Sequence, residues 1–363
     1  VGEGEVTEEI VVSETGKTYD SGTTVKLTAT PVEGWVFVEW SGDKESKTNT
    51  IQIIVNSMLN INAVFKKDSD NDGIYDLIDN CPNTPSGESV DINGCSVSQY
   101  IELGGIYSEN ILLDGKVPYK VTSKVQIAYG TKFEINSGVK IIGGSNNIEV
   151  FGVFKVNGEE QSKVIFEDLN IVGGANNSQK PYVIDINYVN FTNGSLLSAT
   201  GGANYGSLSL KNSTLLNLKN YMYIWYPVDD CLIEKNKFIN CQKISIGTNN
   251  SVKVKILNNL FVRNNLSYNL NNTTLIENWA SYGDSETIVN YNSFYVDDYL
   301  VLKLPAGYDN AKINGINNYW NTSDKSEIEN LIFDKNDDLS CAEFIPFEPF
   351  LTQPNSNTPI KDF

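Results

Sequence analysis

The 363-residue sequence predicts an all-β protein, in which a right-handed parallel β-helix follows a small β domain and an acidic linker. Three observations predict this fold class. Residues 1–66 alternate in the strand manner, residues 68–79 contain five aspartates, and from about residue 99 an apolar pattern recurs roughly every 23 residues. We therefore expect segments at 1–66, 67–98 and 99–352, followed by a tail at 353–363.

The first segment has the pattern of a small β domain. The stretch TVKLTATP places Val25, Leu27 and Ala29 on one face of a strand, and NTIQIIVN repeats the alternation. The arrangement GTTVKLTATPVEGWVFVEWSGD, followed by INAVF, resembles the internalin B-type repeat of bacterial surface proteins over nearly all of this segment. This resemblance implies that Trp35 and Trp40 are core residues; stacking against a ligand is the alternative.

The second segment has the spacing of a metal-binding loop. Counting Asp68 as position 1, side-chain oxygens follow at positions 3, 5, 9 and 12, and Gly73 at position 6 permits a sharp turn. Position 7 would contribute its backbone carbonyl. Hard oxygen ligands select a hard cation, so we expect Ca²⁺ as the cofactor; a solvated acidic linker is the alternative. The expected ligands are Asp68, Asp70, Asp72, Ile74, Asp76 and Asp79.

The same stretch and the residues after it resemble a known calcium repeat. DSDNDGIYDLIDNCPNTPSGESVDINGC is similar to a thrombospondin type 3 repeat over its full length, including its Cys-Pro and closing Gly-Cys. It departs from an EF-hand in having Asp79 instead of a bidentate glutamate at position 12. Asp91 and Asn93 are candidates for a second, incomplete metal site. Cys81 and Cys95 bracket a loop rich in proline and glycine and are candidates for a disulfide in an oxidising compartment.

An internal repeat organises the third segment. Successive anchor residues are 24, 23, 23, 33 and 26 positions apart. Apolar residues recur five positions before the first five anchors, and asparagine recurs two positions before each of the last four anchors. The anchors are Phe191, Leu215, Phe238, Phe261, Phe294 and Trp320; the preceding apolar residues are Ile186, Leu210, Ile233, Ile256 and Val289; the asparagines are Asn236, Asn259, Asn292 and Asn318.

This repeat predicts a parallel β-helix. A unit of about 23 residues cannot bury its apolar face alone, whereas stacked coils form a continuous core with like residues above like. The right-handed form is expected because parallel crossovers favour that hand. We expect asparagine at the bends because it tolerates left-handed backbone conformations and bonds to nearby backbone groups.

A family resemblance agrees with the repeat. KVQIAYGTKFEINSGVKIIGGSNNIEVFGVFKVNG, with KVIFED after it, looks like the first rungs of pectate-lyase-like right-handed β-helix proteins from bacterial surfaces. NNYWNTSDKSEIENLIFDKNDDLSCAEFIPFEPFLTQP resembles the closing segment of the same group. The resemblance covers most of residues 110–352 and implies a short helix at 325–333 with Asp324 near its N-terminus.

Composition narrows the range of functions. The net charge of −18 argues against a nucleic-acid partner. With no histidine, and Arg263 as the single arginine, the commonest general base is missing. No stretch approaches the roughly 18 apolar residues of a membrane span, and the chain starts without a charged-then-apolar leader, as in a mature or trimmed product. We expect a secreted or surface-displayed bacterial protein, with Cys341 as the odd cysteine.

One candidate function is an enzyme acting on acidic polysaccharides. A lyase on this scaffold needs a base near a cationic group, and a hydrolase needs two placed carboxylates. Adjacent residues of a strand point to opposite faces, so neighbouring aspartates are not by themselves a carboxylate pair. No catalytic residue is assigned, and enzymatic activity stays open. The residues considered are Asp229 with Asp230, Asp297 with Asp298, Asp337 with Asp338, and Lys235 or Lys237 nearby.

A second candidate function is a glycan-binding or adhesive face. The stretch YMYIWYP at 221–227 is the densest aromatic run, and alternation groups Tyr221, Tyr223 and Trp225 on one side. Counting six and eight residues past the repeat anchors places Tyr221 and Tyr223 in an inward register, which favours a core role for them. The outward residues, forming an exposed patch, would then be Met222, Ile224 and Tyr226.

The combined observations favour a non-catalytic extracellular module. In this interpretation Ca²⁺ rigidifies the joint between a small β domain and a β-helix that is displayed for adhesion, glycan binding or extracellular assembly. Its partners would be glycans or other surface proteins. The alternative is a polysaccharide lyase or hydrolase.

Overall fold

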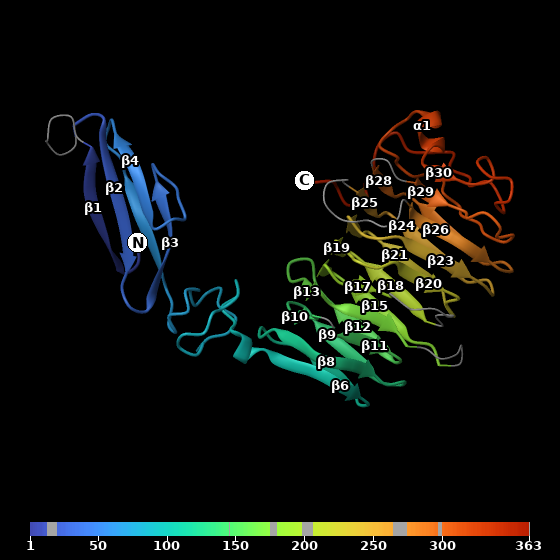
Figure 1. Ribbon diagram of the computed structural model, residues 1–363, viewed down its shortest axis with the longest axis horizontal. Helices are drawn as coiled ribbons and strands as arrows, with labels where there is room; N and C mark the ends of the chain where they lie inside the picture. The colour runs from blue at the N-terminus through green and yellow to red at the C-terminus, as the bar shows by residue number, and fades with distance from the viewer. Residues whose placement is uncertain are drawn as a thin grey trace. The chain divides into compact units, whose positions relative to one another are not determined.

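The computed structural model describes residues 1–12, 20–144, 146–174, 180–197, 206–263, 274–296 and 300–362. The chain forms two compact units, Val1–Tyr100 and Ile101–Phe363. The first unit contains small antiparallel sheets and the acidic segment, and the second is a parallel β-solenoid of about 7 turns (Figure 1). The predicted fold class is confirmed, whereas the finer division into four segments stays a prediction.

Two antiparallel sheets form the β domain of the first unit. One has the strand order β1-β2-β4 and the other pairs β3 with β5. Trp40 is only 1% exposed, and Trp35 packs against the same apolar cluster, so the predicted core role of both tryptophans is confirmed. The strands are β1 (Gly4–Val12), β2 (Thr23–Pro31), β3 (Trp35–Gly42), β4 (Thr50–Val55) and β5 (Ile61–Lys67), and a 3₁₀ helix follows at Val97–Gln99.

Three parallel sheets make up the solenoid. The first contains β6 (Ile101–Tyr107), β8 (Tyr119–Ile127), β10 (Lys140–Ile142), β11 (Asn147–Val150), β13 (Val164–Glu167), β14 (Asn170–Gly173), β16 (Val189–Thr192), β17 (Ser195–Leu196), β19 (Thr214–Leu216), β22 (Lys237–Ile239), β25 (Leu260–Arg263) and β28 (Ser293–Val296). The second contains β7 (Ile111–Leu113), β9 (Lys132–Asn136), β12 (Val153–Asn157), β15 (Val183–Asn187), β18 (Ser207–Lys211), β21 (Cys231–Glu234), β24 (Lys253–Leu257) and β27 (Glu286–Asn290). The third contains β20 (Met222–Trp225), β23 (Ile244–Thr248), β26 (Thr274–Ser281), β29 (Leu300–Lys303) and β30 (Ile332–Phe333).

The repeat anchors stack as the sequence predicts. Phe238 pairs with Phe261, which pairs with Phe294, and their rings lie 4.8 and 5.4 Å apart between centroids. Trp320 continues the stack 5.2 Å from Phe294. The residues five positions earlier also lie in one file, from Ile186 through Leu210, Ile233 and Ile256 to Val289. Both files belong to one continuous apolar core.

The recurring asparagines bond to nearby backbone groups as predicted, but they are not themselves the left-handed residues. The left-handed residue at each of these bends is the one before the asparagine, such as Asn258 with φ 54° before Asn259. The asparagines themselves are fully buried and bond to each other across coils: the backbone N–H of Asn236 donates to Oδ1 of Asn259, and that of Asn259 to Oδ1 of Asn292, each at 2.9 Å. Their side chains therefore satisfy buried backbone groups where the chain turns and the strand ladder is interrupted.

The closing segment contains one short helix, α1 (Lys325–Glu329). Asp324 is its N-cap, with its carboxylate accepting from the backbone N–H of Ser326, as the sequence predicts. The predicted extension to residue 333 is wrong, because Ile332 and Phe333 form β30 and pair with β29 of the solenoid. None of the described helices has the length and apolarity needed to cross a membrane.

The inward register predicted for Tyr221 and Tyr223 is also wrong. Met222 pairs with Ile244 and Ile224 with Ile246, and these four residues are buried. Five residues, 217–221, separate β19 from β20, whereas four, 240–243, separate β22 from β23 one coil later. Because a shift of one residue moves every side chain of a strand to the other face, β20 turns its aromatic residues outward.

Candidate metal site and aromatic cleft

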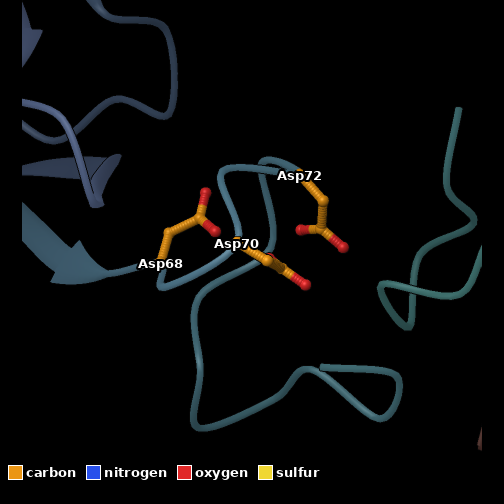
Figure 2. Close-up of side chains that lie close together, drawn as sticks. All are labelled: Asp68, Asp70 and Asp72. Carbon is orange, nitrogen blue, oxygen red and sulfur yellow. The ribbon is translucent and has the colours of Figure 1, made fainter. Parts of the chain in front are cut away.

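Three aspartates gather at one loop of the first unit. Carboxylate oxygens of Asp68, Asp70 and Asp72 lie within 4.8 Å of one another. Figure 2 shows the three side chains on their loop. Two oxygens bound to one calcium ion at about 2.3–2.6 Å cannot be more than about 5 Å apart. The spacing predicted from the sequence therefore brings these three oxygens to within the reach of a single ion.

Asp68 is the residue that most needs a cation. Its side chain is 3% exposed, and its Oδ2 accepts from the backbone N–H of Gly73 at 3.0 Å. Its Oδ1 is buried and has no hydrogen-bond partner among the described residues. Burial raises the pKa of this carboxyl, and the charge of Asp72 adds to the shift. A buried oxygen without a partner is costly, and a bound cation would supply the missing contact.

The remaining predicted ligands divide into two groups. Asp79 lies beside the cluster: its pKa is raised by burial and by the charges of Asp72, Asp70 and Asp68. Asp76 is exposed, and both of its carboxylate oxygens accept hydrogen bonds from Ser69, which lower its pKa. In this conformation Asp76 holds the loop closed. Its role as a ligand, like that of the Ile74 carbonyl, stays a prediction.

Two residues outside the predicted ligand set complete the loop. The backbone N–H of Thr84 donates to Asp70 at 2.8 Å, and its hydroxyl lies 3.1 Å from Oδ2 of Asp72. The backbone of Gly94 passes so close that a Cβ there would lie 2.1 Å from Oδ1 of Asp79. The acidic spacing gives no signal for Thr84, whereas the closing Gly-Cys pair of the resemblance does point to Gly94.

The proposed second metal site has another arrangement in the structure. Oδ1 of Asp91 accepts from the backbone N–H groups of Asn93 and Cys95, and its Oδ2 accepts from the side chain of Asn93. These bonds close a turn, in the way that aspartate often stabilises a loop. A second ion at Asp91 and Asn93 stays a prediction.

A disulfide joins Cys81 to Cys95, across a separation of 14 residues. The other three cysteines, Cys231, Cys241 and Cys341, are free and buried. Burial raises the pKa of Cys231 to about 12 and that of Cys241 to about 11, so neither is a thiolate at neutral pH.

Replacing both Cys81 and Cys95 by alanine should lower the free energy of unfolding of the first unit by about 3 kcal/mol, because the link restricts the unfolded chain. Urea unfolding followed by amide hydrogen exchange would measure this. Adding a reductant should lower the free energy of unfolding of the wild-type protein to that of the variant. It should not change the free energy of unfolding of the variant. A reductant that did not alter the wild-type midpoint would contradict the prediction.

Those candidate catalytic acids that the structure describes have separate partners and are not brought together in a common site. Asp230 is bound by the backbone N–H of Lys253 and the ammonium of Lys255. Asp337 and Asp338 accept from backbone N–H groups of the closing segment. Lys237 pairs with Asp362 at 2.8 Å, Lys235 is exposed at a bend, and Asp297 with Asp298 lies outside the described residues.

The outward register of β20 creates a cleft on the third sheet of the solenoid. It has a volume of about 360 Å³, within the range of ligand sites. Its rings follow one another at close spacing: Tyr223 to Trp225 at 4.6 Å, and Trp225 to Trp279 at 5.4 Å, between centroids. We call this the aromatic cleft; its lining residues are Tyr221, Tyr223, Trp225, Lys243, Ser245, Glu277, Trp279, Pro305 and Tyr308.

The charges of the aromatic cleft are paired. The ammonium of Lys243 lies 2.8 Å from Glu277, and both side chains are largely buried. Lys243 also lies 4.9 Å from the ring centroid of Tyr221, in cation–π contact. Among the described lining residues, Glu277 is the single carboxylate and Lys243 the single ammonium. The cleft thus combines ring faces with a compensated ion pair.

Comparisons with known proteins give partial matches. Residues 2–69 match the model of the Divergent InlB B-repeat domain, in agreement with the internalin B-type resemblance. An alpha-agarase of Alteromonas agarilytica is 40% identical over 80 residues, which are 22% of this chain and 5% of that protein. An alpha-agarase of Thalassotalea agarivorans is 60% identical over 30 residues, which are 8% and 2% of the respective chains.

Each of these matches covers a minor part of the chain. The aligned parts are a small fraction of the length of either agarase. No solved structure matches the chain. The comparisons therefore support the B-repeat assignment at residues 2–69 and do not assign a function to the chain.

Proposed function

We propose that this chain is a glycan-binding module of an extracellular protein, in which Ca²⁺ orders the acidic loop of the first unit. The observation that carries the binding function is the aromatic cleft. Soluble proteins rarely leave large aromatic side chains grouped on an open face unless the face contacts a partner. Sugars present C–H faces that pack on aromatic rings and hydroxyl groups that bond to nearby polar side chains.

Calcium has a structural role in this proposal. The support is the unpartnered buried oxygen of Asp68 beside two further carboxylates, all on oxygen-bearing side chains that suit a hard cation. An ion bound here would order residues 68–95 within the first unit, since binding to the folded state alone adds to its stability. The thrombospondin type 3 resemblance fits the same proposal.

An extracellular location is supported by two observations. The first unit matches a B-repeat domain, and its disulfide between Cys81 and Cys95 is of a kind that persists in oxidising compartments. The pectate-lyase-like resemblance of the solenoid belongs with this proposal, because that group occurs on bacterial surfaces. Because the two partly matching proteins are named alpha-agarases, agar is the polysaccharide to test first.

Binding is tested by affinity electrophoresis in gels that contain agarose, pectin, alginate or xylan. The wild-type protein should be retarded by at least one polysaccharide and should remain intact and unretarded in a gel without glycan. A chain that moved equally in all gels would contradict the proposed function.

Cleavage of a polysaccharide is the second candidate function, favoured by the agarase matches. A hydrolase needs two carboxylates roughly 5–9.5 Å apart, and the described lining of the aromatic cleft offers Glu277 alone. We therefore expect binding without turnover. Incubation with each polysaccharide, followed by assays of reducing ends and of the absorbance of unsaturated products, should show no increase over a protein-free control; a protein-dependent increase would favour the enzyme.

A further inference from the structure

We infer that the aromatic cleft takes a neutral polysaccharide of hexopyranose units, with Trp279 as the main stacking surface and the Lys243–Glu277 pair as the determinant of neutral over acidic glycans. This inference rests on the proposed function and names its ligand class and site. Three features of the cleft support it: the position of Trp279, the pairing of its two charges and the types of side chain that line it.

The position of Trp279 depends on a glycine and on an irregularity in the strand. The register between β23 and β26 shifts between Ile246 and Gly247. A Cβ at Gly247 would lie 2.7 Å from Cζ2 of Trp279, so the indole rests on the sheet only because residue 247 has no side chain. Such irregularities commonly redirect a side chain near a functional site. The ring is thereby placed between Trp225 and Tyr308, with its centroid 5.4 and 6.1 Å from theirs.

This arrangement costs stability in one respect. Nε1 of Trp279 is buried and has no hydrogen-bond partner among the described residues. A buried donor without an acceptor is unfavourable, and the core residue Trp320 carries the same cost, so it is the position of Trp279 among the rings of the cleft that assigns it to a ligand. Trp225, in contrast, has its Nε1 3.3 Å from the hydroxyl of Ser245, which fixes that ring. Trp225 therefore supports Trp279, and Trp279 is the ring that is not held by a polar contact of its own.

The charges of the cleft select the ligand class. An acidic sugar would need an unpaired cation, but the Lys243 ammonium is bound by Glu277 at 2.8 Å. The chain as a whole carries a net charge of −18 and repels polyanions. Hydroxyl groups of a neutral sugar, on the other hand, can donate to the Glu277 carboxylate and accept from Lys243 without separating the pair. The geometry thus favours neutral hexoses over uronates.

A glycan fits the cleft better than a protein segment. Protein interfaces are also rich in Tyr and Trp, but they take roughly 20–30 residues from each partner, whereas the aromatic cleft has nine lining residues. The rings lie at angles of 65° and 78° to their neighbours, which presents edges and faces along a shallow path. A chain of pyranose rings can follow such a path by packing one C–H face after another.

The experiment is isothermal titration calorimetry, which measures the affinity of the whole chain for two sets of oligosaccharide probes. The neutral set comprises oligosaccharides from agarose, mannan and cellulose, and the charged set comprises oligogalacturonate and oligomers of alginate. Wild-type protein should bind at least one neutral probe about tenfold or more tightly than either charged probe. Trp279→Ala should weaken that binding about tenfold or more, as for the loss of a central aromatic contact. Gly247→Val should do the same without removing any ring.

Control variants distinguish the loss of the binding site from the loss of folding. Tyr129→Ala removes an exposed aromatic ring outside the cleft and should leave affinity unchanged. Tyr308→Ala removes an exposed ring of the cleft from a loop, so it should weaken binding even if Trp279→Ala does not fold. Glu277→Gln frees the Lys243 ammonium and should raise affinity for oligogalacturonate about twofold to fivefold.

The outcomes distinguish the inference from the proposed function. Equal or tighter binding of the charged probes by wild-type protein would overturn the ligand class and leave glycan binding intact. Neutral binding that survives both Trp279→Ala and Tyr308→Ala would place the site elsewhere. If no glycan of either set binds, the proposed function itself fails.

Discussion

Removing calcium should make residues 68–95 the first part of the chain that a protease cuts, with the solenoid left intact. Four like charges in and beside one loop repel each other, and the buried Oδ1 of Asp68 has no other described partner. If free calcium exceeds its dissociation constant a thousandfold, binding contributes about 4 kcal/mol to the folded loop. Limited proteolysis with and without a chelator, with fragments identified by mass spectrometry, measures the effect.

Variants test whether the ion sits where the carboxylates meet. Asp68→Asn should lower calcium affinity by a factor of about ten or more and make cleavage insensitive to the chelator. Glu45→Gln, at an exposed position of the same unit, is the control and should titrate like the wild-type protein. Magnesium should protect less well, because it requires near-octahedral geometry and keeps its waters. Identical calcium titrations for Asp68→Asn and wild type would exclude this site.

The sequence predicts the solenoid well because the repeat is itself the physical cause of the fold. Coils of about 23 residues that bury like above like must keep their apolar positions in register, so Phe238, Phe261 and Phe294 can be aligned from spacing alone. The acidic loop is similarly local, since Asp68, Asp70 and Asp72 alternate within five residues and a turn brings them together. Features that depend on the spacing of residues close together in the sequence can therefore be predicted without a structure.

The sequence groups Tyr221, Tyr223 and Trp225 on one side of a strand as a candidate glycan-binding face, but it favours the core for that side, because the orientation depends on a single residue in a bend. The bend before β20 has one residue more than the bend before β23, and no regular count from the anchors includes it. That residue decides whether Tyr223 points to the core or to solvent. Thr84 was missed for a related reason: it approaches Asp70 from 14 residues away, through a path fixed by the disulfide and the loop rather than by spacing.

Asn259 is a third case, in which the recurrence and the bonds to backbone groups are predicted from the sequence, whereas the conformation and the burial of the residue are not. Left-handed conformation explains why asparagine is common at bends, but at these positions the preceding residue adopts it. What the sequence does not reveal is that the Asn259 side chain lies inside the coil. It is fully buried, and its amide donates to the carbonyls of Ile233 and Leu257.

Replacing Asn259 by alanine should therefore destabilise the solenoid by about 2–6 kcal/mol. The change leaves the backbone N–H of Asn236 and the carbonyl of Ile233 without their side-chain partner, at about 1–3 kcal/mol for each buried group, whereas the carbonyl of Leu257 keeps its bond from the backbone N–H of Lys235. Coils in a solenoid depend on their neighbours, so hydrogen exchange should rise first in β21, β22 and β24 and then spread. Urea unfolding measures the total.

Neighbouring substitutions decide whether the side chain or the bend is responsible. Asn258→Gly keeps the left-handed conformation at φ 54° and should change stability by less than about 1 kcal/mol. Asn190→Ala, at an exposed strand position, should stay within about 0.5 kcal/mol of wild type. If Asn258→Gly proved as damaging as Asn259→Ala, backbone conformation would outweigh the hydrogen bonds. If Asn259→Ala were neutral, the asparagines would not hold the coils together, and ring stacking along Phe238, Phe261 and Phe294 would have to account for their register.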